Sequence, residues 1–196
     1  MYLISDTHFS HAKIIEYENR PFKSIEDMND RLIENWNSVI SKRDTVWHLG
    51  DFCFGNKEMI KNIVPQLNGR IHLVLGNHDG THAYQWWLDC GFEFVSKHPV
   101  IYEGRYILSH EPTLYDIGSG FYNIHGHIHG RENDLDGRYF NVSAEVLNYT
   151  PIDFIIVKKK LENIEDNSNL CPECGKPLIS EWSGIKCSVC DYWFCF

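Results

Sequence analysis

The sequence lacks several features that mark large classes of protein. No apolar run approaches the roughly 20 residues needed to cross a membrane, and the N-terminal stretch has no basic segment followed by a long apolar one, as a signal peptide would have. Basic residues are scarce, since 18 Lys and Arg stand against 27 Asp and Glu, for a formal net charge of -9. Because phosphate backbones and acidic membranes attract basic surfaces, we expect a soluble, cytoplasmic protein without a membrane partner. Nucleic acid is disfavoured and stays an alternative.

Cysteine is also scarce over most of the chain, where only Cys53 and Cys90 precede residue 170. Nearer the C-terminus, four cysteines form two C-x-x-C pairs: Cys171, Cys174, Cys187 and Cys190. In a cytoplasmic chain such clustering indicates metal binding rather than disulfides. Four thiolates at this spacing suit one structural Zn ion in a zinc-ribbon-like module, with a redox-active dithiol as the alternative.

A change of composition separates this module from the rest of the chain. Residues 158–169 are charged and polar and offer few side chains to a core, as linkers do. The sequence therefore predicts a domain over residues 1–157, a linker over residues 158–169 and the zinc-ribbon-like module over residues 170–196. The module has three acidic residues for two basic ones, so we expect protein contact or self-association through it rather than nucleic-acid binding.

Apolar spacing along the first domain is strand-like in some segments and helix-like in others. Strands are predicted over residues 2–5, 45–49, 70–74, 92–95, 100–102, 105–108, 122–125, 138–147 and 152–157. Helices are predicted over residues 24–41, 57–66 and 83–88, the first with Ser24 as its N-cap.

Polar side chains follow five of the predicted strands, several of them at glycine turns. They are Asp6, His8, Asp51, Asn77, His110, His127 and His129. Because strands that end in tight turns present the next side chains at the sheet edge, we expect these residues to converge there. Carboxylate, amide and imidazole donors without thiolate suit Mn, Fe, Zn or Ni, and seven donors are too many for one ion. Two divalent ions that share one bridging carboxylate account for the number, with Mn as the favoured metal.

Two such ions can clamp a phosphoryl group and lower the pKa of a bridging water, so the pattern predicts hydrolysis of a phosphoester by a metal-activated water. His78 lies beside a candidate ligand and is not needed in the donor count, which makes it the candidate general acid. His11, Arg20 and Asn77 are candidate substrate contacts, since Arg can hold phosphate through two hydrogen bonds. Loop packing is the alternative for Arg20, which precedes a proline.

The order of the motifs resembles that of the calcineurin-like metallophosphoesterase superfamily, in particular its small bacterial and phage members. The matching residues are Asp6-x-His8, Gly50-Asp51, Gly76-Asn77-His78-Asp79, His110 and Gly126-His127-x-His129. The resemblance implies an α/β fold, a four-layer α-β-β-α sandwich with the site on one rim. The zinc-ribbon-like module is an addition to that fold.

The resemblance also implies a role for each candidate ligand. It assigns three residues to the first metal: Asp6, His8 and His129. It assigns three to the second: Asn77, His110 and His127. It makes Asp51 the bridge between the ions and places His78 against the substrate phosphate, so these two form the catalytic pair.

One feature of the superfamily's protein-phosphatase branch is missing. That branch extends the Gly-Asp motif with an Asp-Arg pair, whereas this chain continues from Asp51 with Phe52, Cys53 and Phe54. We therefore expect a phosphodiesterase that acts on a small nucleotide or another phosphodiester. A phosphomonoesterase or protein phosphatase, a nuclease, and a non-catalytic interaction module with the same fold are the alternatives.

Overall fold

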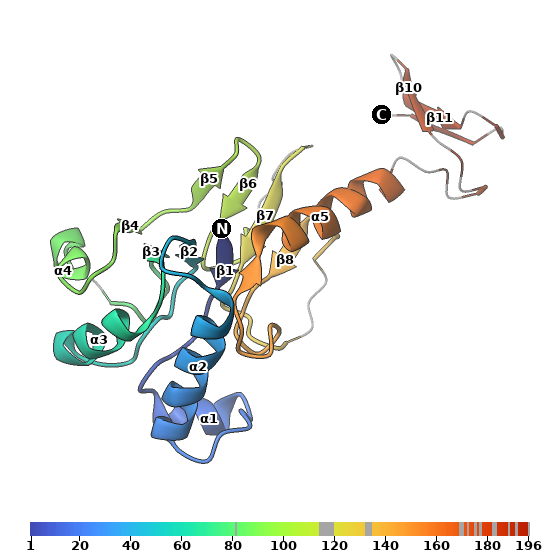
Figure 1. The fold of residues 1–196 in the computed structure, drawn as a ribbon. Helices are drawn as coiled ribbons and strands as arrows, with labels where there is room; N and C mark the ends of the chain where they lie inside the picture. The colour runs from blue at the N-terminus through green and yellow to red at the C-terminus, as the bar shows by residue number, and fades with distance from the viewer. Residues whose placement is uncertain are drawn as a thin grey trace.

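The computed structural model of this chain describes residues 1–80, 82–113, 120–131 and 135–168, and in the C-terminal module residues 171, 173–174, 176, 178–181, 184–187, 189–190 and 192–195. Two sheets, the helices beside them and a small C-terminal sheet make up these parts (Figure 1). Within them, no helix is both long and apolar enough to cross a bilayer.

The first sheet joins five of the described strands in the order β4-β3-β2-β1-β9. Four of these strands run parallel, and β9 runs antiparallel beside β1. Their bounds are β1 Tyr2–Ile4, β2 Thr45–His48, β3 Arg70–Val74, β4 Phe94–Ser96 and β9 Ile152–Asp153. Because β1, β2 and β3 share one direction, the segments that follow them leave the sheet at the same edge.

The second sheet has the order β5-β6-β7-β8 among the residues that the structure describes. β5 Val100–Tyr102 and β6 Tyr106–Leu108 form the antiparallel hairpin that the sequence predicts, and β7 Tyr122–His125 and β8 Tyr139–Asn141 follow in parallel. Ser5, directly after β1, bridges to Ser143 in the segment after β8. The carboxyl ends of β1 in the first sheet and β8 in the second therefore lie side by side.

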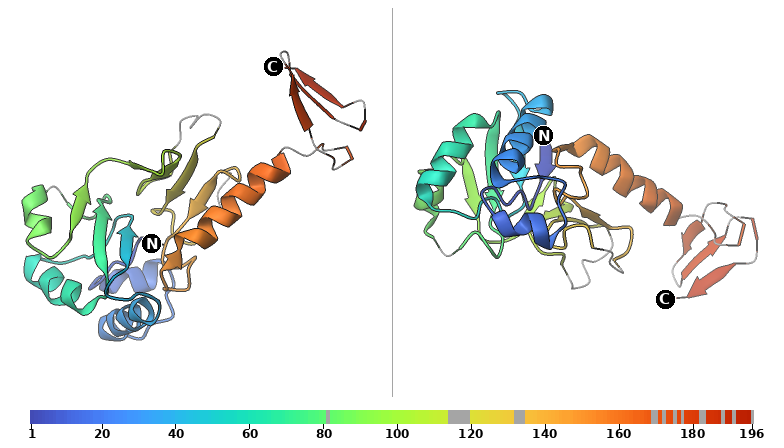
Figure 2. Two further views of the ribbon diagram at one scale, coloured as in Figure 1. Left: turned by 45° about the horizontal axis from the view of Figure 1, so that its top comes forward. Right: turned by 90° about the horizontal axis from the view of Figure 1, so that it is seen from below.

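Helices α1 to α4 cover the outer face of the first sheet, and α5 lies beside the second sheet (Figure 1 and Figure 2). Their bounds are α1 Ala12–Tyr17, α2 Ile25–Val39, α3 Lys57–Ile63 with the 3-10 turn Val64–Gln66, α4 Tyr84–Leu88 and α5 Phe154–Ser168. As predicted, Ser24 caps α2, because its Oγ accepts a hydrogen bond from the Asp27 backbone N–H at 3.2 Å. The result is the mixed α/β architecture that the resemblance implies.

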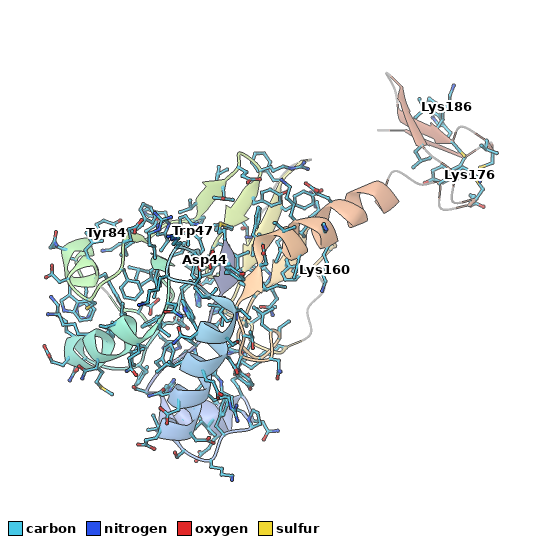
Figure 3. The ribbon with its side chains drawn as sticks, in the orientation of Figure 1. Asp44, Trp47, Tyr84, Lys160, Lys176 and Lys186 are labelled. Atoms are coloured by element: carbon cyan, nitrogen blue, oxygen red, sulfur yellow. The ribbon has the colours of Figure 1, made fainter. Side chains whose placement is uncertain are left out.

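Two apolar clusters hold these layers together. The first lies between the helices and the outer face of the first sheet, where Met28, Leu32 and Trp36 of α2 are buried. The second lies between the two sheets and includes Leu3 of β1 and Trp47 of β2, the latter marked in Figure 3. Full burial of a large apolar side chain contributes about 1.5–3 kcal/mol, so the clusters give the strand ends a rigid support.

The predicted strand over residues 138–147 is wrong in extent. β8 ends at Asn141, whose Oδ1 accepts a hydrogen bond from the Ser143 backbone N–H at 2.9 Å and turns the chain. No helix is predicted where α1 lies. In α1 only Ile14 is buried, and a single buried residue produces no periodic signal.

The segment predicted as a linker is helical where the structure describes it. The predicted strand over residues 152–157 ends at Asp153, and α5 follows it directly. Phe154, Val157 and Leu161 recur at helical spacing and are buried in the second cluster. In the sequence this helical period is hard to recognise, because a short β-branched run lies between Phe154 and Leu161. The packed domain therefore continues past residue 157. Residues 169 and 170 lie outside the described residues.

The described part of the C-terminal module contains an antiparallel sheet in the order β10-β11-β12. The strands are β10 Leu178–Glu181, β11 Gly184–Cys187 and β12 Trp193–Cys195. They follow α5 in the chain, and Figure 1 shows them beyond the end of that helix.

Candidate metal centre

The candidate ligands lie in the loops after five strands, and several have a strained backbone. Positive φ angles between 48° and 69° occur at Asp6, His8, Asp51, His127 and His129. Non-glycine residues rarely adopt this left-handed conformation. Such strain is concentrated at functional sites, where the surrounding structure maintains it. The two packed sheets thus hold these side chains in positions that a free loop would not favour.

Asp6, His8 and His129 form the first group of donors. One ligand atom of each lies within 4.8 Å of the others, and His129 Nε2 is 3.9 Å from Asp6 Oδ1. Asp6 Oδ1 and His8 Nε2 are buried and have no hydrogen-bond partner. A buried polar atom without a partner costs about 1–3 kcal/mol, and a cation between these atoms would remove that cost. The group therefore fits a divalent metal ion.

Asn77, His110 and His127 form the second group. Asn77 Oδ1 lies 2.8 Å from His110 Nε2 and 2.9 Å from His127 Nδ1, and the two imidazole nitrogens are 3.2 Å apart. Imidazole nitrogen and carbonyl oxygen are suitable ligands for first-row divalent metals. Three donor atoms thus converge on a second position.

Asp51 lies between the two groups. Its Oδ2 is 3.5 Å from His8 Nε2 and 3.5 Å from His110 Nε2, while its Oδ1 accepts a hydrogen bond from the His78 backbone N–H at 2.8 Å. One oxygen of a single carboxylate is therefore near a nitrogen of each group, as a bridging ligand must be. The structure brings together all seven donors that were selected from the sequence.

In His110 and His129, a hydrogen bond from Nδ1 to an oxygen outside the centre fixes the ring, so that Nε2 is the nitrogen turned toward the other candidate ligands. His110 Nδ1 lies 2.8 Å from the carbonyl oxygen of Leu49, so Nδ1 carries the proton and Nε2 keeps its lone pair. His129 Nδ1 lies 3.1 Å from Glu145 Oε1, so its Nδ1 is the nitrogen that donates to Glu145 and its Nε2 is the one on the side of Asp6. Burial lowers the pKa of His8, which favours the neutral imidazole that binds metal.

Arg20 is buried and cannot reach a substrate, which corrects its prediction as a substrate contact. Its guanidinium donates to the backbone carbonyl oxygens of Asp6 at 2.7 Å and Thr7 at 2.9 Å. It also donates twice to Glu145 Oε1, at 2.6 and 2.9 Å. Arg20 and Glu145 therefore connect the loop of Asp6 to the loop of His129.

Asp79 has a role that was not predicted from the sequence. Its carboxylate accepts backbone N–H bonds from Gly76 at 2.7 Å, Asp51 at 2.8 Å and Phe52 at 2.9 Å. Burial raises the pKa of this carboxyl to about 6, although the backbone hydrogen bonds act in the opposite direction. The carboxylate ties the loop after β2 to the loop after β3. Its place at the end of the Gly-Asn-His-Asp motif is the signal in the sequence for this role.

Gly76 and Gly126 allow the loops to approach one another closely. A Cβ atom at Gly76 would collide with the Asp51 carboxylate, and a Cβ atom at Gly126 would collide with the Asp6 carboxylate and the Ser5 hydroxyl. Only glycine leaves room for such an approach. The glycines of the two motifs are therefore part of the construction of the centre.

Two histidines near the centre, in β2 and β7, are hydrogen-bonded within the protein. His48 Nε2 lies 3.0 Å from Thr7 Oγ1, and His125 Nδ1 lies 2.9 Å from the Gly126 carbonyl oxygen. Both side chains are buried. They support the loops and are not placed to act as ligands.

The open side of the centre carries His78 and His11. His78 and Asn77 are exposed, and the His78 ring centroid is 5.6 Å from that of His8. His11 is half-buried, with its Nδ1 3.3 Å from His8 Nδ1. Its ring stacks on Phe54 with the centroids 4.2 Å apart. These side chains can meet a ligand that approaches the donors from solvent.

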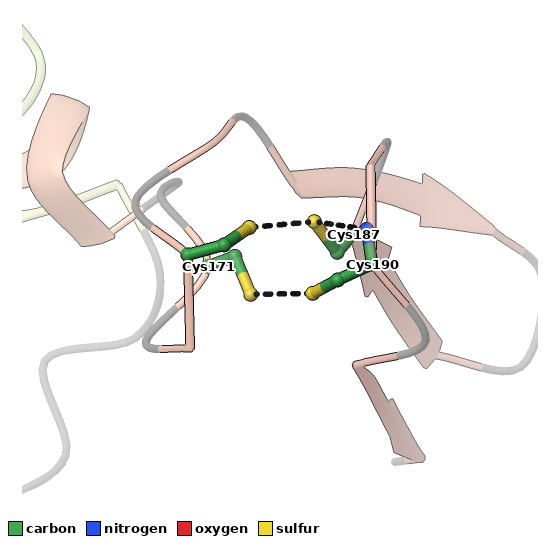
Figure 4. Close-up of side chains that lie close together, drawn as sticks. Cys171, Cys187 and Cys190 are labelled. Carbon is green, nitrogen blue, oxygen red and sulfur yellow. Dashed lines mark hydrogen bonds between the residues drawn. The ribbon is translucent and has the colours of Figure 1, made fainter.

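The cysteines of the C-terminal module form a second candidate metal site. Their four Sγ atoms lie within 4.8 Å of one another. Cys171 Sγ is 3.5 Å from Cys190 Sγ, and Cys174 Sγ is 3.4 Å from Cys187 Sγ (Figure 4). The backbone N–H groups of Val189 and Cys190 each donate to Cys187 Sγ at 3.3 Å. Four converging sulfur donors fit a tetrahedral zinc ion.

Known proteins that are similar in sequence point to one family. The family model of the calcineurin-like phosphoesterases matches residues 1–180. An uncharacterized protein of Methanocaldococcus jannaschii is 39% identical over 175 residues, which are 83% of this chain and 91% of that protein. The gene 66 protein of Mycobacterium phage L5 is 32% identical over 158 residues, which are 64% of this chain and 75% of the phage protein.

A solved structure is also similar. The crystal structure of a protein of unknown function from Aquifex aeolicus has a TM-score of 0.61 and 26% sequence identity, and the match covers 81% of this chain and 97% of that one. Carboxylate, amide and imidazole donors meet at one edge of two packed sheets, and the family match spans the whole of this region. The chain thus belongs to the calcineurin-like phosphoesterase family, whose members are metal-dependent phosphoester hydrolases.

Proposed function

We propose that this protein is a phosphodiesterase with two divalent metal ions that acts on small nucleotides. Oxygen and nitrogen donors without sulfur suit Mn, Fe, Zn or Ni, and we propose Mn as the favoured metal with the other three as alternatives. The observation that carries the proposal is the position of Asp51 Oδ2, 3.5 Å from a nitrogen of each donor group. The first group would hold one ion, the second group the other, and Asp51 would bridge them.

The residues of the chain have separate tasks in this reaction. When bound, the two ions supply Lewis acidity to the phosphoryl oxygens and an activated water. Leu49 and Glu145 orient His110 and His129 through the hydrogen bonds described above. His78, on the open side, donates a proton from its imidazolium to the leaving oxygen. The bond from its backbone N–H to Asp51 Oδ1 holds its loop in place.

The shape of the open side favours a diester. A recess of about 530 Å³ lies toward α1 and another of about 300 Å³ toward α4, and Phe54 and His78 line both. A phosphodiester carries an organic group on each side of its phosphorus, so each group has a recess available. The absence of an Asp-Arg pair after Asp51 also counts against the protein-phosphatase branch.

The C-terminal cysteines would hold one structural zinc ion. A module of this size has little apolar core, so a metal ion would supply much of its stability. A cytoplasmic location stays a prediction, and a reducing compartment would keep these thiolates available to the zinc ion. Contact with a protein partner through this module stays a prediction.

Turnover of two chromogenic esters tests the proposal. We expect the Mn-loaded protein to cleave bis(4-nitrophenyl) phosphate faster than 4-nitrophenyl phosphate. We expect His78→Ala to lower kcat for the diester by about 10²–10⁴-fold, with the metal content unchanged. His98→Ala is the matched control, because His98 is an exposed histidine that lines neither of the two recesses. Preference for the monoester would indicate a phosphomonoesterase, and full turnover in His78→Ala would reject its role as the acid.

A further inference from the structure

A row of aromatic rings leads from the candidate metal centre into the larger recess. The His11 ring centroid is 5.3 Å from that of His8. On its outer side His11 stacks on Phe54, with the ring planes 16° apart. The Tyr17 ring meets the edge of His11 at 83°, with the centroids 6.5 Å apart. One wall of the recess is therefore made of rings from α1 and from the loop after β2.

Two of these rings present large apolar surfaces to solvent. Tyr17 is 66% exposed and Phe54 is 51% exposed. Single exposed apolar residues are common on protein surfaces, but these two line the same recess. The volume of the recess, about 530 Å³, is within the range of pockets that bind small molecules. An aromatic wall in such a recess suits a flat ligand.

We propose that this recess is the subsite for the nucleobase of the substrate, with Tyr17 and Phe54 stacking on the base. The inference rests on the proposed function, because it assumes that the substrate phosphate lies at the metal centre. Bases of every kind have a π-face, so stacking on aromatic side chains recognises a base with little sequence preference.

The recess adjoins the metal centre, so its occupant is more consistent with the base of the substrate than with an unrelated apolar partner. His78 lines the recess and is also the candidate acid, so a group bound there adjoins the reacting phosphate. Lys13, on the rim, adds a positive charge in a chain with a net charge of -9. A nucleotide, with a flat base and an anionic phosphate, matches both features.

A pair of esters with the same leaving group tests the subsite. Thymidine 5′-(4-nitrophenyl phosphate) and methyl 4-nitrophenyl phosphate differ in the nucleoside and share the 4-nitrophenolate that is released. We expect the wild-type protein to favour the thymidine ester in kcat/KM. We expect Tyr17→Ala and Phe54→Ala each to reduce this preference about 5- to 150-fold, the range of base stacking on an aromatic ring.

Tyr84→Ala is the matched control. Tyr84 is 45% exposed and lies on α4, away from α1 (Figure 3). It is absent from the lining of both recesses, so its removal should leave the preference unchanged. Turnover of both esters without a preference, or a preference that survives in Tyr17→Ala and Phe54→Ala, would overturn the subsite and leave the proposed function standing.

A binding measurement separates the subsite from the chemistry. If the wild-type protein cleaves neither ester, the proposed function fails, and calorimetry with thymidine 5′-monophosphate and 2-deoxyribose 5-phosphate then decides the subsite. Tighter binding of the nucleotide that is lost in Tyr17→Ala would support it. Equal binding of the two probes would reject it.

Discussion

Glu145 connects a candidate metal ligand to a buried cation. Its Oε1 accepts from His129 Nδ1 at 3.1 Å and from Arg20 at 2.6 Å. Burial acts to raise the pKa of this carboxyl, but the hydrogen bond from His129 and the charge of Arg20 together outweigh it, so the pKa is lowered. Glu145 is thus ionised at neutral pH and acts as a positioning residue for His129.

Glu145→Gln tests this role. Glutamine keeps an acceptor oxygen but removes the charge that orients His129, and the loss of such a partner weakens metal affinity about 10–100-fold. We expect competition titration with a chelator to show weaker binding of the ion held by the first group of donors, to which His129 belongs. The ion held by the second group should be less affected. Glu34→Gln, at an exposed glutamate of α2, should bind both ions as the wild type does. Equal affinities in Glu145→Gln and the wild type would contradict the assignment.

Asp79→Asn tests the connection between two loops. The carboxylate accepts three backbone N–H groups, whereas an asparagine offers one acceptor oxygen and turns an N–H₂ group toward donors. We expect the free energy of unfolding of the metal-free protein to fall by about 1–3 kcal/mol, measured by urea denaturation. Asp89→Asn, at an exposed aspartate paired with Lys57, should change it by less than about 0.5 kcal/mol. A loss of the same size in both variants would count against a special role for Asp79.

The types of the candidate ligands could be predicted from sequence, whereas the residues that support them could not. Asp6, His8 and Asp51 follow short apolar runs, a local pattern that one segment contains by itself. The pairing of Arg20 with Glu145 joins residues 125 positions apart. The two residues come together only because the second sheet packs against the first. No pattern within one segment of the sequence could have predicted the pair.

At the scale of elements, the parallel strands were easier to predict than α5. β2 and β3 are short apolar runs between polar turns, and both strands occur where they were predicted. In α5 the β-branched run over residues 155–157 has strong β propensity. A helix nevertheless forms, because only helical spacing lets Phe154, Val157 and Leu161 all pack in the second apolar cluster. Tertiary packing decided the conformation of this segment.

Two substitutions in α5 test its packing. Leu161 is fully buried, whereas Ile155 on the same helix is 58% exposed. We expect Leu161→Ala to reduce the free energy of unfolding by about 2–5 kcal/mol, since it leaves a cavity in the core. Ile155→Ala removes little buried surface and should cost less than about 1 kcal/mol. Similar losses in both variants would show that α5 does not pack as described.

At the scale of the whole molecule, the chain carries two kinds of candidate metal site. Oxygen and nitrogen donors gather where the two sheets meet, and sulfur donors gather in the C-terminal module. Hard and borderline donors select a different range of metals from four thiolates. Residue types and spacing alone predicted both groups, because each lies on short motifs. The extent of the packed domain needed the structure, since it depends on where α5 lies.

Metal content per chain is the measurement that tests the two-metal account most directly. Elemental mass spectrometry on protein grown with Mn and Zn should find two divalent ions beyond one zinc in the wild type. Asp51→Asn should lose at least one of the two and keep the zinc, because Asp51 lies between the two donor groups. Cys187→Ser should lose the zinc alone. A wild-type protein with a single ion beyond the zinc, or an Asp51→Asn protein with full metal content, would contradict the account.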